Sequence, residues 1–148
     1  LWARVASDLV ISIDMAVAAE FYGGLTDDGM TKRNAAFAAQ FPHVHGIVGN
    51  SHHLPTERAM CNLLDGRPID LLFIDGDHTR EGVQADYEMY GKYVRPGGVI
   101  AFHDVICDPS RSAPLEIDVR SFFDTLPGPR FVFHAGSYWG GIGAVIAA

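Results

Sequence analysis

The sequence predicts an α/β fold with a doubly wound, mostly parallel sheet. Three observations predict it. Short apolar runs alternate with segments of helical spacing in the order β-α-β-α-β-α-β-α-β-β, which is typical of a parallel sheet with helices on both faces. Polar side chains directly follow several of the apolar runs, where ligands bind in such sheets. The last two expected strands are separated by only a few residues and can pair antiparallel.

In the first half of the chain, residues 1–7 have a short helical pattern. The β-branched run from Asp8 to Ile13 is expected to form a buried strand that ends at Asp14. A loop is expected over 15–29, because its glycines and paired aspartates interrupt regular structure. The remaining elements expected in this half are a helix at 30–41, a strand at 44–48 and a helix at 55–64.

In the second half, an apolar strand is expected at 69–75 and a helix from Thr79 to about Val94. The helix has Val83, Tyr87, Tyr90 and Val94 on one face. The elements expected after it are a turn at 95–98, a strand at 98–103, a helix at 115–126 and two strands at 131–134 and 141–146.

Composition narrows the class of protein. The 148 residues predict a single domain over 1–148 with an ordinary hydrophobic content of 48%. A formal net charge of −7 disfavours nucleic acid as a partner. No apolar run reaches the roughly 20 residues that a membrane span needs. Cys61 and Cys107 are isolated, so we expect reduced thiols and a cytoplasmic location.

The strongest chemical signal is Asp75-Gly76-Asp77-His78, directly after the expected strand at 69–75. The next strand along the chain also ends in acid and imidazole, at His103-Asp104. Together they predict one shared polar site. Its carboxylates and imidazole suit Mg²⁺, or Mn²⁺, Fe²⁺ or Zn²⁺ because of the histidine. The alternative is that Asp75 caps the next helix and that His103 is a buried, hydrogen-bonded histidine.

Other candidates follow from position. His78 is the best general-base candidate because its ordinary pKa of about 6.5 lies near working pH; alternatively it is a helix-entry residue that bonds the backbone. Asp14 ends a strand and can accept hydrogen bonds from ribose hydroxyls, or it is an exposed loop acid. Asn50-Ser51-His52 can bond the edge of an adenine or cap the next helix.

The same residues carry a family resemblance. The blocks 70–78 and 94–104, with Glu81-Gly82-Val83 and Tyr90 between them and 139–143 near the end, resemble the class I S-adenosylmethionine-dependent methyltransferases. More narrowly, they are similar to the bacterial small-molecule O-methyltransferases that include cephalosporin-hydroxylase-type proteins. The resemblance spans most of residues 8–146.

The resemblance implies a Rossmann-like sheet with an antiparallel last strand. It implies that Asp14 binds the cofactor ribose, that Asn50, Ser51 and His52 lie near adenine, and that Asp75 also lies on the cofactor side. Asp75, His103 and Asp104 would hold a divalent cation such as Mg²⁺. Catalysis would fall on His78 as the base, with Asp77 beside it, and the methyl acceptor would be a small hydroxylated molecule.

The sequence departs from the family at its start. The family's first strand and Gly-rich loop have no counterpart, so the domain is expected to be N-terminally incomplete. Because that strand is central, the chain would pair its neighbours directly, rely on a second copy in a homodimer, or be part of a longer protein. Beside an O-methyltransferase, the sequence therefore leaves open an inactive binding or oligomerisation module, and a metal-dependent hydrolase.

Overall fold

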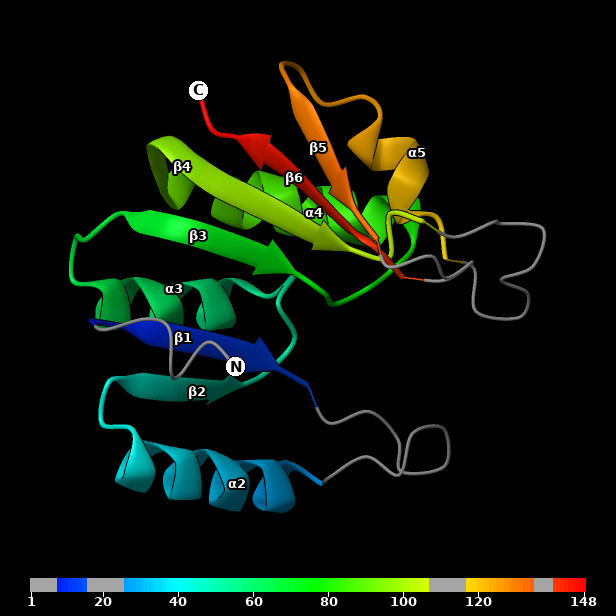
Figure 1. The fold of residues 1–148 in the computed structure, drawn as a ribbon. Helices are drawn as coiled ribbons and strands as arrows, with labels where there is room; N and C mark the ends of the chain where they lie inside the picture. Colours follow the sequence, from blue (N-terminus) through cyan, green and yellow to red (C-terminus); the bar gives the residue numbers. More distant parts are fainter. Residues whose placement is uncertain (1–7, 16–25, 107–116, 135–139) are drawn as a thin grey trace. The chain divides into compact units, whose positions relative to one another are not determined.

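The computed structural model describes residues 8–15, 26–106, 117–134 and 140–148 (Figure 1). The expected helix at 1–7, most of the loop at 15–29, residues 115 and 116 of the helix expected at 115–126, and Cys107 lie outside the described residues. In the described part this helix is shorter than expected and spans Val119–Phe123. The chain divides into two compact units, Leu1–Gly66 and Arg67–Ala148, and each is described by itself. Within the described residues, no helix has the length and apolar character to cross a membrane.

The first unit has a parallel two-stranded sheet. β1 (Val10–Asp14) pairs with β2 (Val44–Val48), so that Asp14 lies opposite Val48 at the carboxyl end of both strands. α2 (Asp27–Gln40) packs against β2, and α3 (Leu54–Leu64) packs against both strands. The expected strands and the helix at 55–64 are confirmed.

The start of α2 corrects the sequence prediction. A loop was expected as far as residue 29, but the helix begins at Asp27. The Thr26 side chain accepts a hydrogen bond from Gly29 N at 3.2 Å and caps the helix. Asp27 and Asp28 occupy the first turn, where negative charge is stabilised by the helix dipole. The aspartates that suggested a loop are therefore part of a helix start.

The second unit has a four-stranded sheet in the order β3-β4-β6-β5. Its strands are β3 (Ile69–Ile74), β4 (Val94–His103), β5 (Arg130–Phe133) and β6 (Ile142–Ile146). β3 and β4 are parallel, whereas β6 runs antiparallel to both β4 and β5. The predicted Rossmann-like fold with an antiparallel last strand is confirmed.

Two helices cover one face of this sheet, α4 (Arg80–Tyr90) and α5 (Val119–Phe123) (Figure 1). A short 3₁₀ turn, η2 (Gly91–Tyr93), joins α4 to β4. The core lies between the helices and the sheet, where Phe102 is fully buried against Tyr87, Phe122 and Phe123. The predicted apolar face of the helix after Thr79 is confirmed by the burial of Val83 and Tyr90. The expected extension of this helix to Val94 is wrong, because α4 ends at Tyr90 and Val94 begins β4.

The turn expected at 95–98 is a bulge inside β4. Val94 already pairs with Ile69, and the register then shifts before Leu71 pairs with Val99. Gly97 provides the positive φ of 76° that the irregularity needs. The described strands form a two-stranded sheet in the first unit and a four-stranded sheet in the second.

Candidate functional site

The second unit brings the two acid-and-histidine clusters together. Because β3 and β4 are parallel and Ile74 pairs with Phe102, Asp75 and His103 leave the sheet at the same edge. Asp75 Oδ1 lies 3.2 Å from His103 Nδ1. The expected shared polar site is therefore formed, and we call Asp75, His78, His103 and Asp104 the polar cluster.

His78 lies between two carboxylates of the polar cluster. Its Nε2 is 3.1 Å from Asp75 Oδ1, and its Nδ1 is 2.8 Å from Asp104 Oδ2. The hydrogen bond to Asp75 and the charges of both aspartates raise the pKa of His78 above 6.5, although desolvation opposes them. A histidine held at both ring nitrogens by acids keeps its proton more firmly than a free one.

Asp104 reaches this position through an unusual backbone. It follows β4 directly and has a φ of 57°, in the left-handed region that few non-glycine residues adopt. Its side chain is the most buried of the cluster, 13% exposed, against 24% for His78 and 46% for Asp75. Backbone conformations of this kind gather at functional sites.

The state of His103 supports the fit of the polar cluster to a divalent cation. His103 Nδ1 is buried and lies 3.2 Å from Asp75 and 3.1 Å from Asp104, yet it has no aligned hydrogen bond among the described residues. A buried nitrogen that faces carboxylates without an aligned hydrogen bond is poorly satisfied, and a cation would satisfy it. One donor atom each from Asp75, His78 and His103 lies within 4.8 Å of the others. This group contains two of the three predicted ligands, Asp75 and His103, with His78 in the place of Asp104.

Asp77 faces away from this arrangement. Its Oδ1 accepts a hydrogen bond from Thr79 N at 2.9 Å, and its carboxyl carbon lies against Gly82 of α4. Thr79 is the residue that caps α4, through the hydrogen bond from Gly82 N. The residue that caps α4 is therefore Thr79 and not Asp75, which was the alternative considered for Asp75.

The first unit places the predicted cofactor residues after its two strands. Asp14 Oδ1 accepts a hydrogen bond from Met15 N at 2.9 Å, and Oδ2 forms a 3.0 Å ion pair with Arg33 of α2. Asp14 is 46% exposed, so a ligand can reach it. No pattern in the sequence indicates Arg33, since its pairing with Asp14 depends on how α2 packs.

Asn50, Ser51 and His52 form the connection from β2 to α3. Asn50 Oδ1 accepts a hydrogen bond from His52 N at 2.8 Å, which shapes a turn ahead of the helix. The N-cap of α3 is His53, and its side chain makes no capping hydrogen bond. Asn50 therefore shapes this turn and is not the residue that caps the helix.

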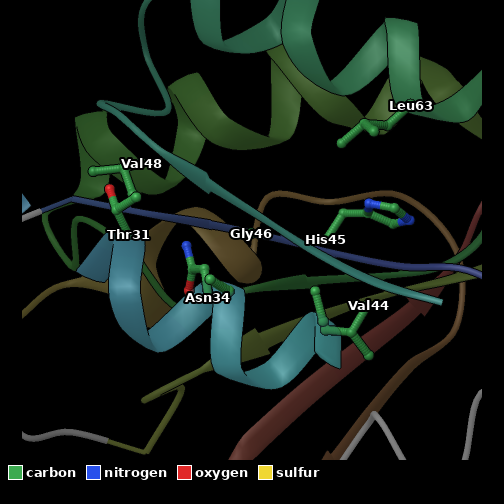
Figure 2. Close-up of a pocket in the computed structure, with 9 residues that line it drawn as sticks. Thr31, Asn34, Val44, His45, Gly46, Val48 and Leu63 are labelled. Carbon is green, nitrogen blue, oxygen red and sulfur yellow. The ribbon is translucent and has the colours of Figure 1, made fainter. Parts of the chain in front are cut away.

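A pocket of about 450 Å³ lies elsewhere in the first unit, where α2 faces β2 (Figure 2). None of the predicted site residues lines it. Its lining is mostly aliphatic with a few polar side chains: Thr31, Asn34, Ala35, Ala38, Val44, His45, Gly46, Val48 and Leu63.

Known proteins share this fold and part of this sequence. The chain is 42% identical over 67 residues to the uncharacterized protein R132 of Acanthamoeba polyphaga mimivirus, which covers 42% of this chain and 29% of that protein. The cofactor-bound structure of Rv0187 from MTB superimposes with a TM-score of 0.62 at 20% identity, over 94% of this chain and 61% of that one. The O-methyltransferase from Bacillus cereus in complex with SAH gives a TM-score of 0.56 at 17% identity, over 92% of this chain and 73% of that one.

The solved structures and the family match establish different things about the chain. At 20% and 17% identity the solved structures establish the fold alone, and the chain spans less than two thirds of both Rv0187 and the mimivirus protein. Family membership rests on sequence: residues 5–105 of the 148 match the family described as a methyltransferase domain. That segment contains Asp14, the Asn50 turn and the whole polar cluster. The chain therefore belongs to the methyltransferase domain family.

Proposed function

We propose that the chain is the catalytic domain of an S-adenosylmethionine-dependent O-methyltransferase that acts on a small hydroxylated molecule. The polar cluster is the observation that carries the proposal, because it joins an acid-held imidazole to candidate cation ligands at one sheet edge. Within the family, the 70–104 block supports the cephalosporin-hydroxylase-type group of bacterial O-methyltransferases. A homodimer stays a prediction.

Oxygen acceptors explain why such a cluster is useful. S-adenosylmethionine supplies an electrophilic methyl group, but a neutral hydroxyl is a poor nucleophile and must lose its proton. His78 is the proposed base. Asp104 holds its Nδ1 at 2.8 Å and fixes the ring, and Nε2, which lies 3.1 Å from Asp75 Oδ1, would accept the acceptor's proton once it gives up that contact. Asp14 is the proposed ribose ligand, and Asn50, Ser51 and His52 are proposed to lie against adenine.

A divalent cation is proposed to assist, held by Asp75, His103 and Asp104. Bound there, it would lower the pKa of the acceptor hydroxyl. The distances also support His78 as a ligand in place of Asp104, since the donors of Asp75, His78 and His103 lie within 4.8 Å. His78→Gln separates the two sets: Mn²⁺ affinity is kept if His78 is the base and falls if it is a ligand.

The activity test is transfer of a labelled methyl group from S-adenosylmethionine to a panel of small phenols and alcohols, with Mg²⁺ or with EDTA. The proposal expects transfer that Mg²⁺ stimulates and that Asp75→Asn abolishes. Asp124→Asn is the matched control, because Asp124 pairs with Arg120 on the surface of the same unit. Binding of the cofactor without transfer to any acceptor would instead support a binding module.

A further inference from the structure

Four residues outside the polar cluster connect it to α4. They are Gly76 and Asp77 in the turn before the helix, and Gly82 and Asp86 in the helix itself. The turn at residues 75–78 carries Asp75 and His78, with Gly76 and Asp77 between them. A Cβ atom added to Gly82 of α4 would lie 2.2 Å from Asp77 Cγ, far inside any allowed contact. The Asp77 carboxyl group therefore occupies the space that a side chain at position 82 would fill.

In the second contact the helix provides the carboxylate and the turn provides the glycine. A Cβ atom added to Gly76 would lie 3.1 Å from Oδ2 of Asp86. Asp86 is one helical turn after Gly82 on the same face of α4, and it is only 5% exposed. The turn thus places a carboxylate over a glycine of the helix, and the helix places a carboxylate over a glycine of the turn.

Capping of α4 does not need these contacts, because Thr79 already caps the helix through the hydrogen bond from Gly82 N. Both contacts restrict the turn between Asp75 and His78, which flank Gly76 and Asp77, and so restrict the positions of these two residues. The Asp118 N–H donates to the His78 carbonyl at 2.8 Å and holds the far end of the turn.

We propose that Gly76, Gly82 and Asp86 are positioning residues that hold Asp75 and His78 at their separation in the polar cluster. This positioning role rests on the proposed function only where it concerns cation binding. The geometry of the turn can be measured without any ligand. Residues that support metal ligands in this way typically change metal affinity by 10- to 100-fold when they are altered.

The test compares Gly82→Ala with Gly91→Ala in the 148-residue chain. Gly91 lies at the other end of α4, and the nearest atom to an added Cβ there is 3.6 Å away, an ordinary contact. We expect Gly82→Ala to shift the backbone amide NMR resonances of residues 75–78 and to weaken Mn²⁺ binding by at least tenfold. Gly91→Ala is expected to leave both unchanged.

Asp86 provides a second test if Gly82→Ala does not fold. Asp86→Asn keeps the size and an acceptor oxygen, so it should retain the wild-type resonances and Mn²⁺ affinity, whereas Asp86→Ala should lose both. A residue that served only the stability of α4 would lower the unfolding midpoint in Asp86→Ala and leave Mn²⁺ affinity unchanged. Unchanged amide resonances over 75–78 in folded Gly82→Ala or Asp86→Ala protein would overturn the inference.

The two proposals fail in different ways. A wild-type chain that binds no Mn²⁺ contradicts the proposed cation, while the amide resonances still decide whether Gly82 and Asp86 position the turn. A wild-type chain that binds Mn²⁺, with variants that bind it equally and keep their resonances, contradicts the positioning role and leaves the proposed function in place.

Discussion

At the scale of single residues, His78 determines how the polar cluster responds to pH. Both of its ring nitrogens face carboxylates, at 3.1 and 2.8 Å, so the proton is held in the folded chain more firmly than in the unfolded one. Because its pKa is raised, the ring keeps its proton to a higher pH than a free imidazole, and it must lose that proton before it can act as a base.

We therefore predict that NMR titration of the metal-free chain gives His78 a pKa above 6.5. Because the folded pKa is raised, the stabilisation is complete below the unfolded pKa and is lost as the pH rises through the folded value. Asp75→Asn should lower the pKa of His78, since Asp75 provides the largest contribution. A His78 that titrates at or below 6.5 in the wild-type chain would contradict this account.

The convergence of Asp75 and His103 was predictable from sequence, because parallel strands end at the same edge of a sheet. The left-handed backbone of Asp104 was not, since periodicity carries no information on a single φ after a strand. Asp86 was missed for a related reason. Its spacing of four from Gly82 was visible, but its burial depends on the turn that packs over it.

At the scale of elements, β4 links the core to the polar cluster. Phe102 is fully buried by α4 and α5 and immediately precedes His103. Sequence predicted the apolar run but not its true start at Val94, because Pro96-Gly97-Gly98 is read as a turn. In the structure the same residues form a bulge, which keeps the strand paired on both sides of it.

We predict that Phe102→Ala lowers the free energy of unfolding by about 3–5 kcal/mol, because the site cannot close over so large a cavity. The control is Phe133→Ala on β5, where the ring is 62% exposed, and surface changes of this kind usually stay within about 0.5 kcal/mol. Urea denaturation followed by circular dichroism measures both. Equal effects of the two substitutions would show that the buried aromatic cluster does not stabilise the sheet.

At the scale of the whole molecule, the chain divides its proposed functions between two units. Asp14 and the Asn50 turn belong to Leu1–Gly66, and the polar cluster belongs to Arg67–Ala148. The alternation of strands and helices predicted the fold and the order of the described strands along the chain. It did not predict that β6 lies between β4 and β5 in the four-stranded sheet, because strand neighbours are set by tertiary pairing and not by local pattern.

The central claim is that this chain binds the methyl-donor cofactor through Asp14, and isothermal titration with S-adenosylhomocysteine tests it most directly. The account predicts saturable binding by the wild-type chain that Asp14→Ala abolishes. Asp65→Asn is the control, since Asp65 caps the C-terminal end of α3 in the same unit and asparagine also tolerates its φ of 49°. No binding by the folded wild-type chain, or equal binding by Asp14→Ala, would contradict the claim.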